Sequence, residues 1–192
     1  AVQSILKNNL FGLELDLRAA QLSQFALVLK AAQFSRTVLL GGLLPQIYAM
    51  PQQRIFSRDE VITFLGTENM RYADQLYKSL QTMEQAYNLG SIMVLQLSGE
   101  ARKAVESRYD YWKQQPASSL EEVIVKEVFP AYIPILLILT SQFQCIAANP
   151  PYMGKKSMNG KLNQYVAKHY QKGKSDLFAV FMEVCHRLSS KG

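Results

Sequence analysis

A short apolar run that passes directly into a helix is the feature that most constrains the fold of this chain. Residues Leu10 to Leu15 predict a strand, and from Asp16 onward the apolar residues follow helical spacing. Asp16 stands where its side chain can cap that helix. A strand followed by a helix is half of a βαβ unit, so these residues predict a parallel sheet. The expected helical stripe comprises Ala19, Leu22, Ala26 and Leu29.

Two further apolar runs predict neighbouring strands of the same sheet. Gln46 to Met50 lies between two prolines, and Phe143 to Ala148 leads into a double proline. The intervening residues 57–140 are far too long for an ordinary connection between strands. We therefore predict an α/β chain in which residues 1–56 and 141–192 form the core and residues 57–140 form a long, mainly helical insertion.

Local signals support helices in the insertion and at the end of the chain. Ser57 with Glu60, and Ser119 with Glu122, match capping boxes. Breaks are expected at Gly90 and in residues 114–118. The expected apolar stripe of the insertion is Met70, Ala73, Tyr77, Leu80, Met83 and Tyr87. In the closing helix, which we expect Ser175 to cap, the stripe is Phe178, Phe181, Met182, Cys185 and Leu188.

The positive charge of the chain is concentrated near its end. The net charge is +6, and residues 145–192 hold eight of the 21 basic residues but only two of the 15 acidic ones, so the remainder balances. Such a region can attract a phosphate backbone, or it can be a solvated lysine-rich surface. The basic residues are Lys155, Lys156, Lys161, Lys168, Lys172, Lys174, Arg187 and Lys191.

Composition excludes several classes of protein. With 48% hydrophobic and 19% charged residues, a chain of 192 residues is expected to bury one sizeable core. Val128 to Leu139 is too short and too rich in proline to span a bilayer, and no signal segment is visible. Cys145 and Cys185 match neither a disulfide framework nor a metal site, which favours a reducing, cytoplasmic setting. A strand close behind Ala1 suggests a fragment.

Two histidines complete the set of candidate metal ligands. His169 and His186 have no Cys, Asp or Glu partner at ligand spacing, so surface or packing roles are favoured over metal binding.

The tetrapeptide Asn149-Pro150-Pro151-Tyr152 is the most unusual local feature. Two successive prolines end the preceding strand and hold a rigid, extended turn. The carbonyls of the Asn149 side chain and of Pro150 can accept both hydrogens of an exocyclic amine, and Tyr152 offers a face for a planar base. This combination indicates methylation of an amino group, although a simple strand-ending turn would use the same residues.

The residues around the tetrapeptide carry a family resemblance. Cys145 to Tyr152 resembles motif IV of the amino-methyltransferases that use S-adenosylmethionine, and Phe11 to Asp16 with Arg18 to Leu22 resembles their second motif. Lys174 to Phe178, with Phe181 and Glu183 after it, resembles the helix that follows motif IV. Together with Met153-Gly154, Met158-Asn159 and the long insert, these motifs resemble the large adenine methyltransferases of bacterial BREX phage-defence systems (PglX-like).

The resemblance implies a partial Rossmann-like methyltransferase fold that binds S-adenosylmethionine and methylates N6 of an adenine flipped out of double-stranded DNA. It implies that Asn149, Pro150, Pro151 and Tyr152 form the catalytic turn and that Glu14 holds the ribose hydroxyls. The other candidate cofactor contacts are Met50, by packing, and Asp16, which is better suited to capping the helix. Expected partners are DNA and other subunits of a defence or restriction-modification system, with no membrane. The candidate DNA-binding residues are Lys155, Lys156, Lys161, Lys172 and Lys174.

The sequence departs from the family pattern in two places. No glycine-rich first motif precedes Glu14, and Gly41-Gly42 comes after the predicted helix, where such a loop would not serve. Gln144 stands where the family often has an acid. The isolated chain is therefore expected to bind cofactor poorly.

Two other functions use the same residues. Methyltransferases that act on a glutamine side chain of protein factors also end their fourth strand with this turn, and methyl transfer only to protein would identify one of these. A non-catalytic DNA-binding or assembly module that retains the fold is the other alternative. A glycine-rich loop shortly before Ala1 in the full-length gene would favour an enzyme over that module.

Overall fold

The computed structural model describes residues 1–190 and divides the chain into two compact units. The first unit is Ala1–Pro51 and the second is Gln52–Gly192. Lys191, one of the eight basic residues near the end of the chain, lies outside the described residues. Within residues 1–190, none of the helices combines the length and the apolar character needed to cross a bilayer.

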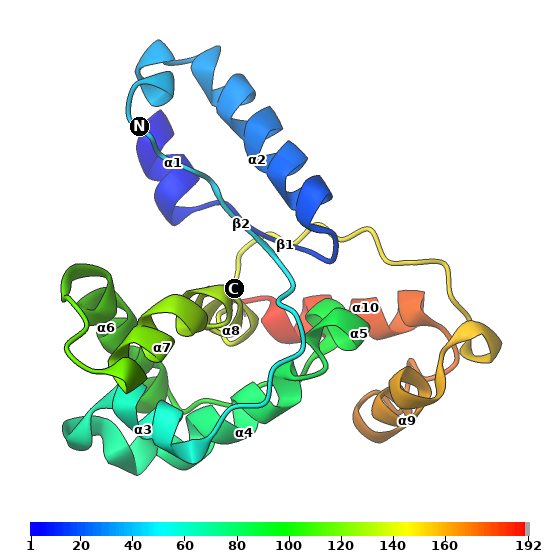
Figure 1. Ribbon diagram of the computed structural model, residues 1–192. Helices are drawn as coiled ribbons and strands as arrows, with labels where there is room; N and C mark the ends of the chain where they lie inside the picture. Colours follow the sequence, from blue (N-terminus) through cyan, green and yellow to red (C-terminus); the bar gives the residue numbers. More distant parts are fainter. Residues whose placement is uncertain (191–192) are drawn as a thin grey trace. The chain divides into compact units, whose positions relative to one another are not determined.

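The first unit contains the predicted βαβ arrangement (Figure 1). Strand β1 (Phe11–Glu14) pairs in parallel with β2 (Gln46–Ala49), in a register that places Glu14 opposite Ala49. Helix α2 (Leu17–Ala32) connects them. Asp16 caps α2, because its carboxylate accepts a hydrogen bond from the Ala19 N–H at 2.9 Å. The strands predicted before and after α2 are both confirmed. Helix α1 (Val2–Asn8) precedes β1, and the 3₁₀ turn η1 (Arg36–Leu39) follows α2.

The face of α2 that is buried differs from the predicted one. Of the predicted stripe, Leu22 and Leu29 remain 67% and 48% exposed. The helix instead packs Leu27 and Val28, on another side, around a small core of Leu6, Ala31 and Val38. Because α2 is apolar on nearly every side, the helical period fits either face, and the pattern alone does not select the buried one.

The second unit is built from helices and short 3₁₀ turns. Residues 57–140 form α3 (Arg58–Leu65), η2 (Thr67–Tyr72), α4 (Ala73–Met83), α5 (Ala86–Leu89), η3 (Gly90–Ile92), α6 (Gly99–Gln114), α7 (Leu120–Val128), η4 (Phe129–Ala131) and α8 (Ile133–Leu139). The rest of the unit forms η5 (Lys155–Ser157), α9 (Gly160–His169) and α10 (Leu177–Leu188). The expected breaks at Gly90, which has a φ of 56°, and between α6 and α7 are confirmed.

Helix starts in this unit follow their capping residues. The capping box of Ser57 and Glu60 is complete and begins α3. At α7, Ser119 accepts from the Glu122 N–H, as predicted, but the Glu122 carboxylate accepts from the backbone and hydroxyl of Ser118 instead of from Ser119. The predicted box is therefore only half correct.

Aromatic rings form the centre of the unit. Phe64 stacks on Phe129 with ring centroids 4.6 Å apart, and Phe56 meets Phe129 edge-on at 5.4 Å. The indole N–H of Trp112 donates to the Phe64 carbonyl at 2.9 Å. The predicted stripe along α4 is buried at Ala73, Leu80 and Met83, whereas its ends, Met70 and Tyr87, are exposed.

Three predictions for the end of the chain are wrong in whole or in part. Phe143 to Ala148 is not a strand: Phe143 makes one isolated bridge, to Ser189, and the sheet found among residues 1–190 has two strands. A strand requires a neighbour to complete its backbone hydrogen bonds, and the apolar run alone does not supply one. In α10, Phe178 and Met182 are exposed, and the cap is Asp176 instead of Ser175. The buried residues of α10 are Leu177, Val180, Val184 and Leu188.

Candidate active site

The tetrapeptide belongs to a segment that is fixed at both ends to one helix, α10. At its start, the Phe143 N–H donates to the Leu188 carbonyl at 2.8 Å, and the Ser190 N–H donates to the Phe143 carbonyl at 2.9 Å. At its end, the Leu177 N–H donates to the Met153 carbonyl at 3.0 Å. The segment therefore begins at the carboxyl end of α10 and finishes at the amino end (Figure 1).

The second anchor continues for two more residues. Lys155 N–H donates to the Ser175 carbonyl at 2.9 Å, and Gly154 forms an antiparallel bridge with Asp176. Asp176 also caps α10 through the Phe178 N–H at 2.7 Å. The chain that leaves the tetrapeptide is thus locked to the residues that start the helix.

The segment between the anchors is longer than the helix it accompanies. Helix α10 has 12 residues and so is about 18 Å long. Residues 144–152, if fully extended, reach about 30 Å. The surplus length lets the segment bow away from α10, and the turn is accordingly exposed: Tyr152 is 96% exposed, and Asn149 and Pro151 are also exposed.

The predicted cofactor residues of the first unit lie together at the carboxyl end of its strands. The Met50 N–H donates to the Glu14 backbone carbonyl at 2.8 Å, which extends the β1–β2 pairing by one residue. The Glu14 carboxylate turns back and accepts from the Leu15 and Asp16 N–H groups at 2.7 and 3.3 Å. Both bonds use Oε1. Asp16 is occupied in capping α2.

Comparison with known proteins shows the family to which the chain belongs. A family model described as Eco57I restriction-modification methylase matches residues 8–192. The chain belongs to this methylase family. It is 31% identical over 202 residues to the adenine-specific methyltransferase BrxX of Escherichia coli O9:H4 (strain HS), across 94% of this chain and 17% of that protein. It is 30% identical over 198 residues to the adenine-specific methyltransferase PglX of Lacticaseibacillus casei (strain Zhang), across 100% of this chain and 16% of that protein. The chain thus spans about a sixth of these relatives.

The five lysines that are candidates for DNA binding follow the turn of this methylase chain, and all five are exposed. Among the described residues, none of them forms an ion pair with an acidic side chain. They are Lys155, Lys156, Lys161, Lys172 and Lys174. Arg187, which the charge pattern placed in the same basic region, is half-buried and bonded to the Tyr170 hydroxyl at 2.8 Å.

Gly173, between two of the candidate DNA-binding lysines, is a residue that the sequence did not single out. It lies between Lys172 and Lys174, and its N–H donates to the Glu183 carboxylate at 2.6 Å. A Cβ at this position would lie 2.8 Å from backbone atoms of Ala179 and Val180. The turn therefore packs directly on α10, with an exposed lysine on each side. The separation of ten residues between Gly173 and Glu183 gave no local signal of this contact.

The histidines of this region have packing or surface positions. The His169 ring stacks on Tyr165 with centroids 4.3 Å apart. Burial, Lys168 and Arg187 together lower the pKa of His169, in that order of importance. In residues 1–190, no cluster of three or more His, Cys, Asp or Glu side chains has an arrangement suited to a metal ion.

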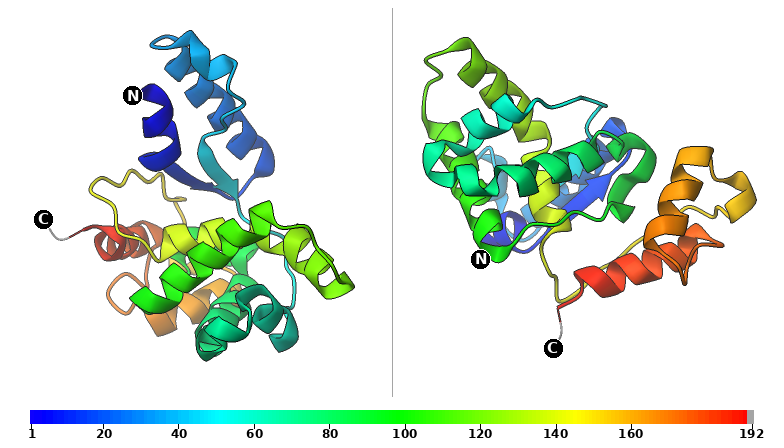
Figure 2. Two further views of the ribbon diagram at one scale, coloured as in Figure 1. Left: turned by 90° about the vertical axis from the view of Figure 1, so that its left-hand side faces the viewer. Right: turned by 90° about the horizontal axis from the view of Figure 1, so that it is seen from below.

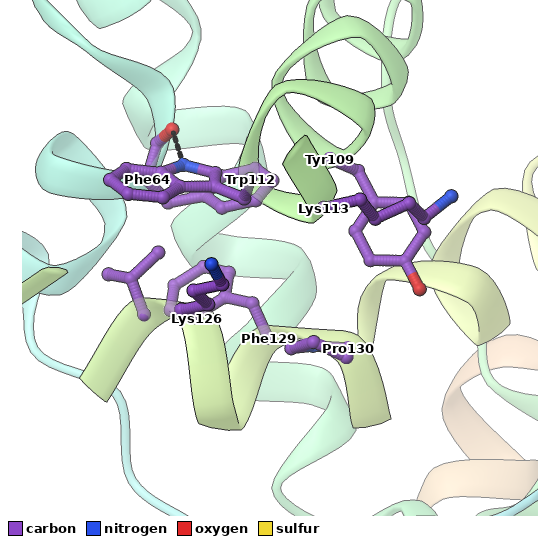
Figure 3. Close-up of a pocket in the computed structure, with 8 residues that line it drawn as sticks. Phe64, Tyr109, Trp112, Lys113, Lys126, Phe129 and Pro130 are labelled. Atoms are coloured by element: carbon purple, nitrogen blue, oxygen red, sulfur yellow. Dashed lines mark hydrogen bonds between the residues drawn. The ribbon is translucent and has the colours of Figure 1, made fainter. Parts of the chain in front are cut away.

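A hollow of about 100 Å³ in the second unit is separate from the tetrapeptide (Figure 3). Phe64, Trp112 and Phe129 form its aromatic wall. Its two lysines already have partners, since Lys113 bonds the Asp110 carboxylate at 2.9 Å and Lys126 bonds the Gln115 carbonyl at 2.5 Å. The hollow is therefore best explained as a gap between packed helices.

Proposed function

We propose that the full-length protein containing this chain transfers a methyl group from S-adenosylmethionine to N6 of adenine in double-stranded DNA. The observation that carries the proposal is the exposed Asn149 to Tyr152 turn held at both ends by α10. Membership of the methylase family, and two relatives named as adenine-specific methyltransferases, support adenine as the base.

The turn supplies the groups that would contact the substrate base. The side-chain carbonyl of Asn149 and the backbone carbonyl of Pro150 each accept one N6 hydrogen, which leaves the nitrogen lone pair directed at an electrophile. Proline has no N–H, so Pro150 and Pro151 keep the backbone in one extended conformation. Tyr152, exposed in this chain, stacks on the adenine ring once the base is out of the duplex.

Cofactor binding is assigned to the end of β1 and β2. Glu14 uses only Oε1 for its two backbone bonds, and Oε2, which takes part in no bond among the described residues, suits a ribose hydroxyl. Met50 is 7% exposed and packs beside the same strand end. These residues fit an adenosine-containing cofactor. S-adenosylmethionine, when bound, supplies an electrophilic methyl group on a positively charged sulfur.

The reaction then requires little more than alignment. Glu14 and Met50 would hold the cofactor, which would supply the methyl group, while Asn149 and Pro150 would hold the amine whose lone pair attacks that group; the proton released from N6 would pass to solvent. The two carbonyls at Asn149 and Pro150 hold the amine in line with the methyl group. The rate enhancement therefore comes from orientation of the reacting groups.

DNA binding is assigned to the basic region after the turn. The exposed lysines Lys155, Lys156, Lys161, Lys172 and Lys174 can neutralise phosphates beside the flipped base. We also propose that residues 1–56 and 141–192 belong to one methyltransferase core and that residues 57–140 are an insertion in it. Other subunits of a defence or restriction-modification system are proposed as partners.

The proposal is tested by substitution of Asn149 in the full-length protein. Asn149→Ala should lower the rate of methyl transfer to DNA about 10²- to 10³-fold, the size typical for loss of one hydrogen bond to the reacting group. Asn8→Ala, which removes an exposed amide from α1, is the control and should leave the rate unchanged. Equal rates for the two variants would refute the role of the turn.

A further inference from the structure

Arg187 joins three separate parts of the second unit. One guanidinium nitrogen donates to the Tyr170 hydroxyl at 2.8 Å, and the other donates to the Met93 backbone carbonyl at 3.0 Å. Arg187 lies in the last turn of α10, Tyr170 directly follows α9, and Met93 directly follows η3. Helices α9 and α10 lie close together in both views of Figure 2.

The partners of Arg187 are themselves firmly held. Tyr170 is 3% exposed, and its hydroxyl donates to the Ile92 carbonyl. Burial raises the pKa of Tyr170 to about 12, so its hydroxyl keeps its proton at neutral pH and can both donate to Ile92 and accept from Arg187. The Tyr165 hydroxyl accepts from the Val94 N–H at 2.7 Å. Three side chains thus fix residues 92–94 of the predicted insertion.

The same arginine is adjacent to the first anchor of the tetrapeptide segment. Leu188, the next residue along the chain, provides the carbonyl that accepts from the Phe143 N–H at 2.8 Å. The position of the last turn of α10 therefore sets where the segment that carries Asn149 begins. Arg187 holds that turn through two directed bonds, one to the Met93 carbonyl and one to the Tyr170 hydroxyl, in a fork that a lysine cannot reproduce.

We propose that Arg187 is a positioning residue, which couples residues 92–94 to the Asn149 to Tyr152 turn through the Leu188–Phe143 bond. This inference rests on the proposed function, since positioning matters only if the turn orients a reacting amine. A displacement of about 1 Å at such a turn is enough to slow a reaction about 10²-fold.

Amide hydrogen exchange tests the coupling in this 192-residue chain without reference to activity. Arg187→Lys should speed exchange at the Phe143 and Ser190 amides about tenfold, because the last turn of α10 opens more often. The Lys155 and Leu177 amides, at the other anchor, should change less than twofold. Unchanged exchange at Phe143 and Ser190 would overturn the inference.

Arg108 provides a matched control. Its guanidinium donates to the Phe64 carbonyl at 2.9 Å and its side chain is 15% exposed, but among the described residues it bonds no part of α10. Arg108→Lys should speed exchange within α3 and α6 and leave Phe143 and Ser190 unaltered. If both variants speed exchange equally at Phe143, Arg187 has a general structural role and the inference fails.

Steady-state kinetics of the full-length protein provides the functional readout. Arg187→Lys should lower kcat for DNA methylation about tenfold with less than a twofold change in the KM for DNA, whereas Arg108→Lys should leave kcat unchanged. A raised KM with an unchanged kcat would overturn the inference, because it would make Arg187 a phosphate contact. If the wild-type protein methylates no DNA while Arg187→Lys still alters exchange, the proposed function fails and the coupling itself is supported.

Discussion

The two units bury their apolar side chains to very different extents. In the second unit Phe64, Leu76 and Ile133 are 0% exposed, and many further apolar side chains of its helices are buried. In the first unit Phe25 and Leu40 are 60% and 88% exposed. Exposed apolar surface of this kind is usually covered in the working protein. The proposed substrate turn thus lies in a unit with its own core, whereas the proposed cofactor residues lie in a unit whose core is small.

The two units also differ in whether they contain a β-sheet. Strands β1 and β2 form a two-stranded parallel pair, and parallel sheets are normally covered on both faces and contain more strands. The second unit needs no sheet, because its helices pack on one another. The second unit is therefore expected to be more stable on its own than the first unit.

The largest effect is expected when the units are separated. Residues 52–192 should unfold cooperatively in urea, with loss of helical circular dichroism in one transition. Residues 1–51 alone should show little cooperative structure, because Leu6, Ala31 and Val38 are too small a core for a chain of that length. A sharp urea transition from residues 1–51 alone would contradict the comparison.

Matched phenylalanine truncations measure the same contrast within the intact chain. Phe64→Ala should lower the free energy of unfolding by about 3–5 kcal/mol, since it leaves a cavity in a packed core. Phe25→Ala, in the first unit, should cost less than about 1 kcal/mol, because most of the ring is already in water. If urea denaturation gave the same decrease in the free energy of unfolding for both variants, Phe25 would be buried in solution.

A smaller effect is expected at the turn beside α10. Gly173→Ala should lower the free energy of unfolding by about 1–3 kcal/mol, because the new Cβ would lie 2.8 Å from backbone atoms that cannot move independently. Gly99→Ala is the control, since no atom lies within 4 Å of its added Cβ. Thermal unfolding of both variants measures the difference, and a neutral Gly173→Ala would mean that the turn does not pack on α10.

The smallest effect is expected for single exposed lysines. Replacing Lys172 by Gln in the full-length protein should reduce the slope of log binding constant against log salt by about 0.9, the value for one lost phosphate contact. Lys103→Gln, an exposed lysine on α6, should leave the slope unaltered. DNA-binding titrations at several salt concentrations would show this, and equal slopes for the two variants would remove Lys172 from the DNA surface.

Sequence reasoning succeeded where the determinants are local. Asp16 and Ser57 cap their helices as predicted, because a cap depends on residues three positions away. It failed where the outcome depends on distant partners. Phe143 to Ala148 has the composition of a strand but lacks strand neighbours in the described chain, and α10 buries a face that its apolar pattern does not distinguish.

The candidate site shows the same limit. The Asn149 to Tyr152 turn was evident from four consecutive residues, and its exposure suits a binding role. Its attachment to both ends of α10 was not predictable, because the anchoring bonds join residues 20 to 47 positions apart. Arg187 was counted with the basic surface, yet its bond to Met93 spans 94 positions.

Nucleoside analysis of DNA methylated by the full-length protein tests the central claim most directly. Unmethylated duplex DNA is incubated with the protein and S-adenosylmethionine, digested to nucleosides and analysed by mass spectrometry. We predict that N6-methyladenine appears with the wild-type protein and with Asn8→Ala and falls about 10²- to 10³-fold with Asn149→Ala. Methyl groups found only on protein glutamine, or N6-methyladenine formed equally by Asn149→Ala, would contradict the account.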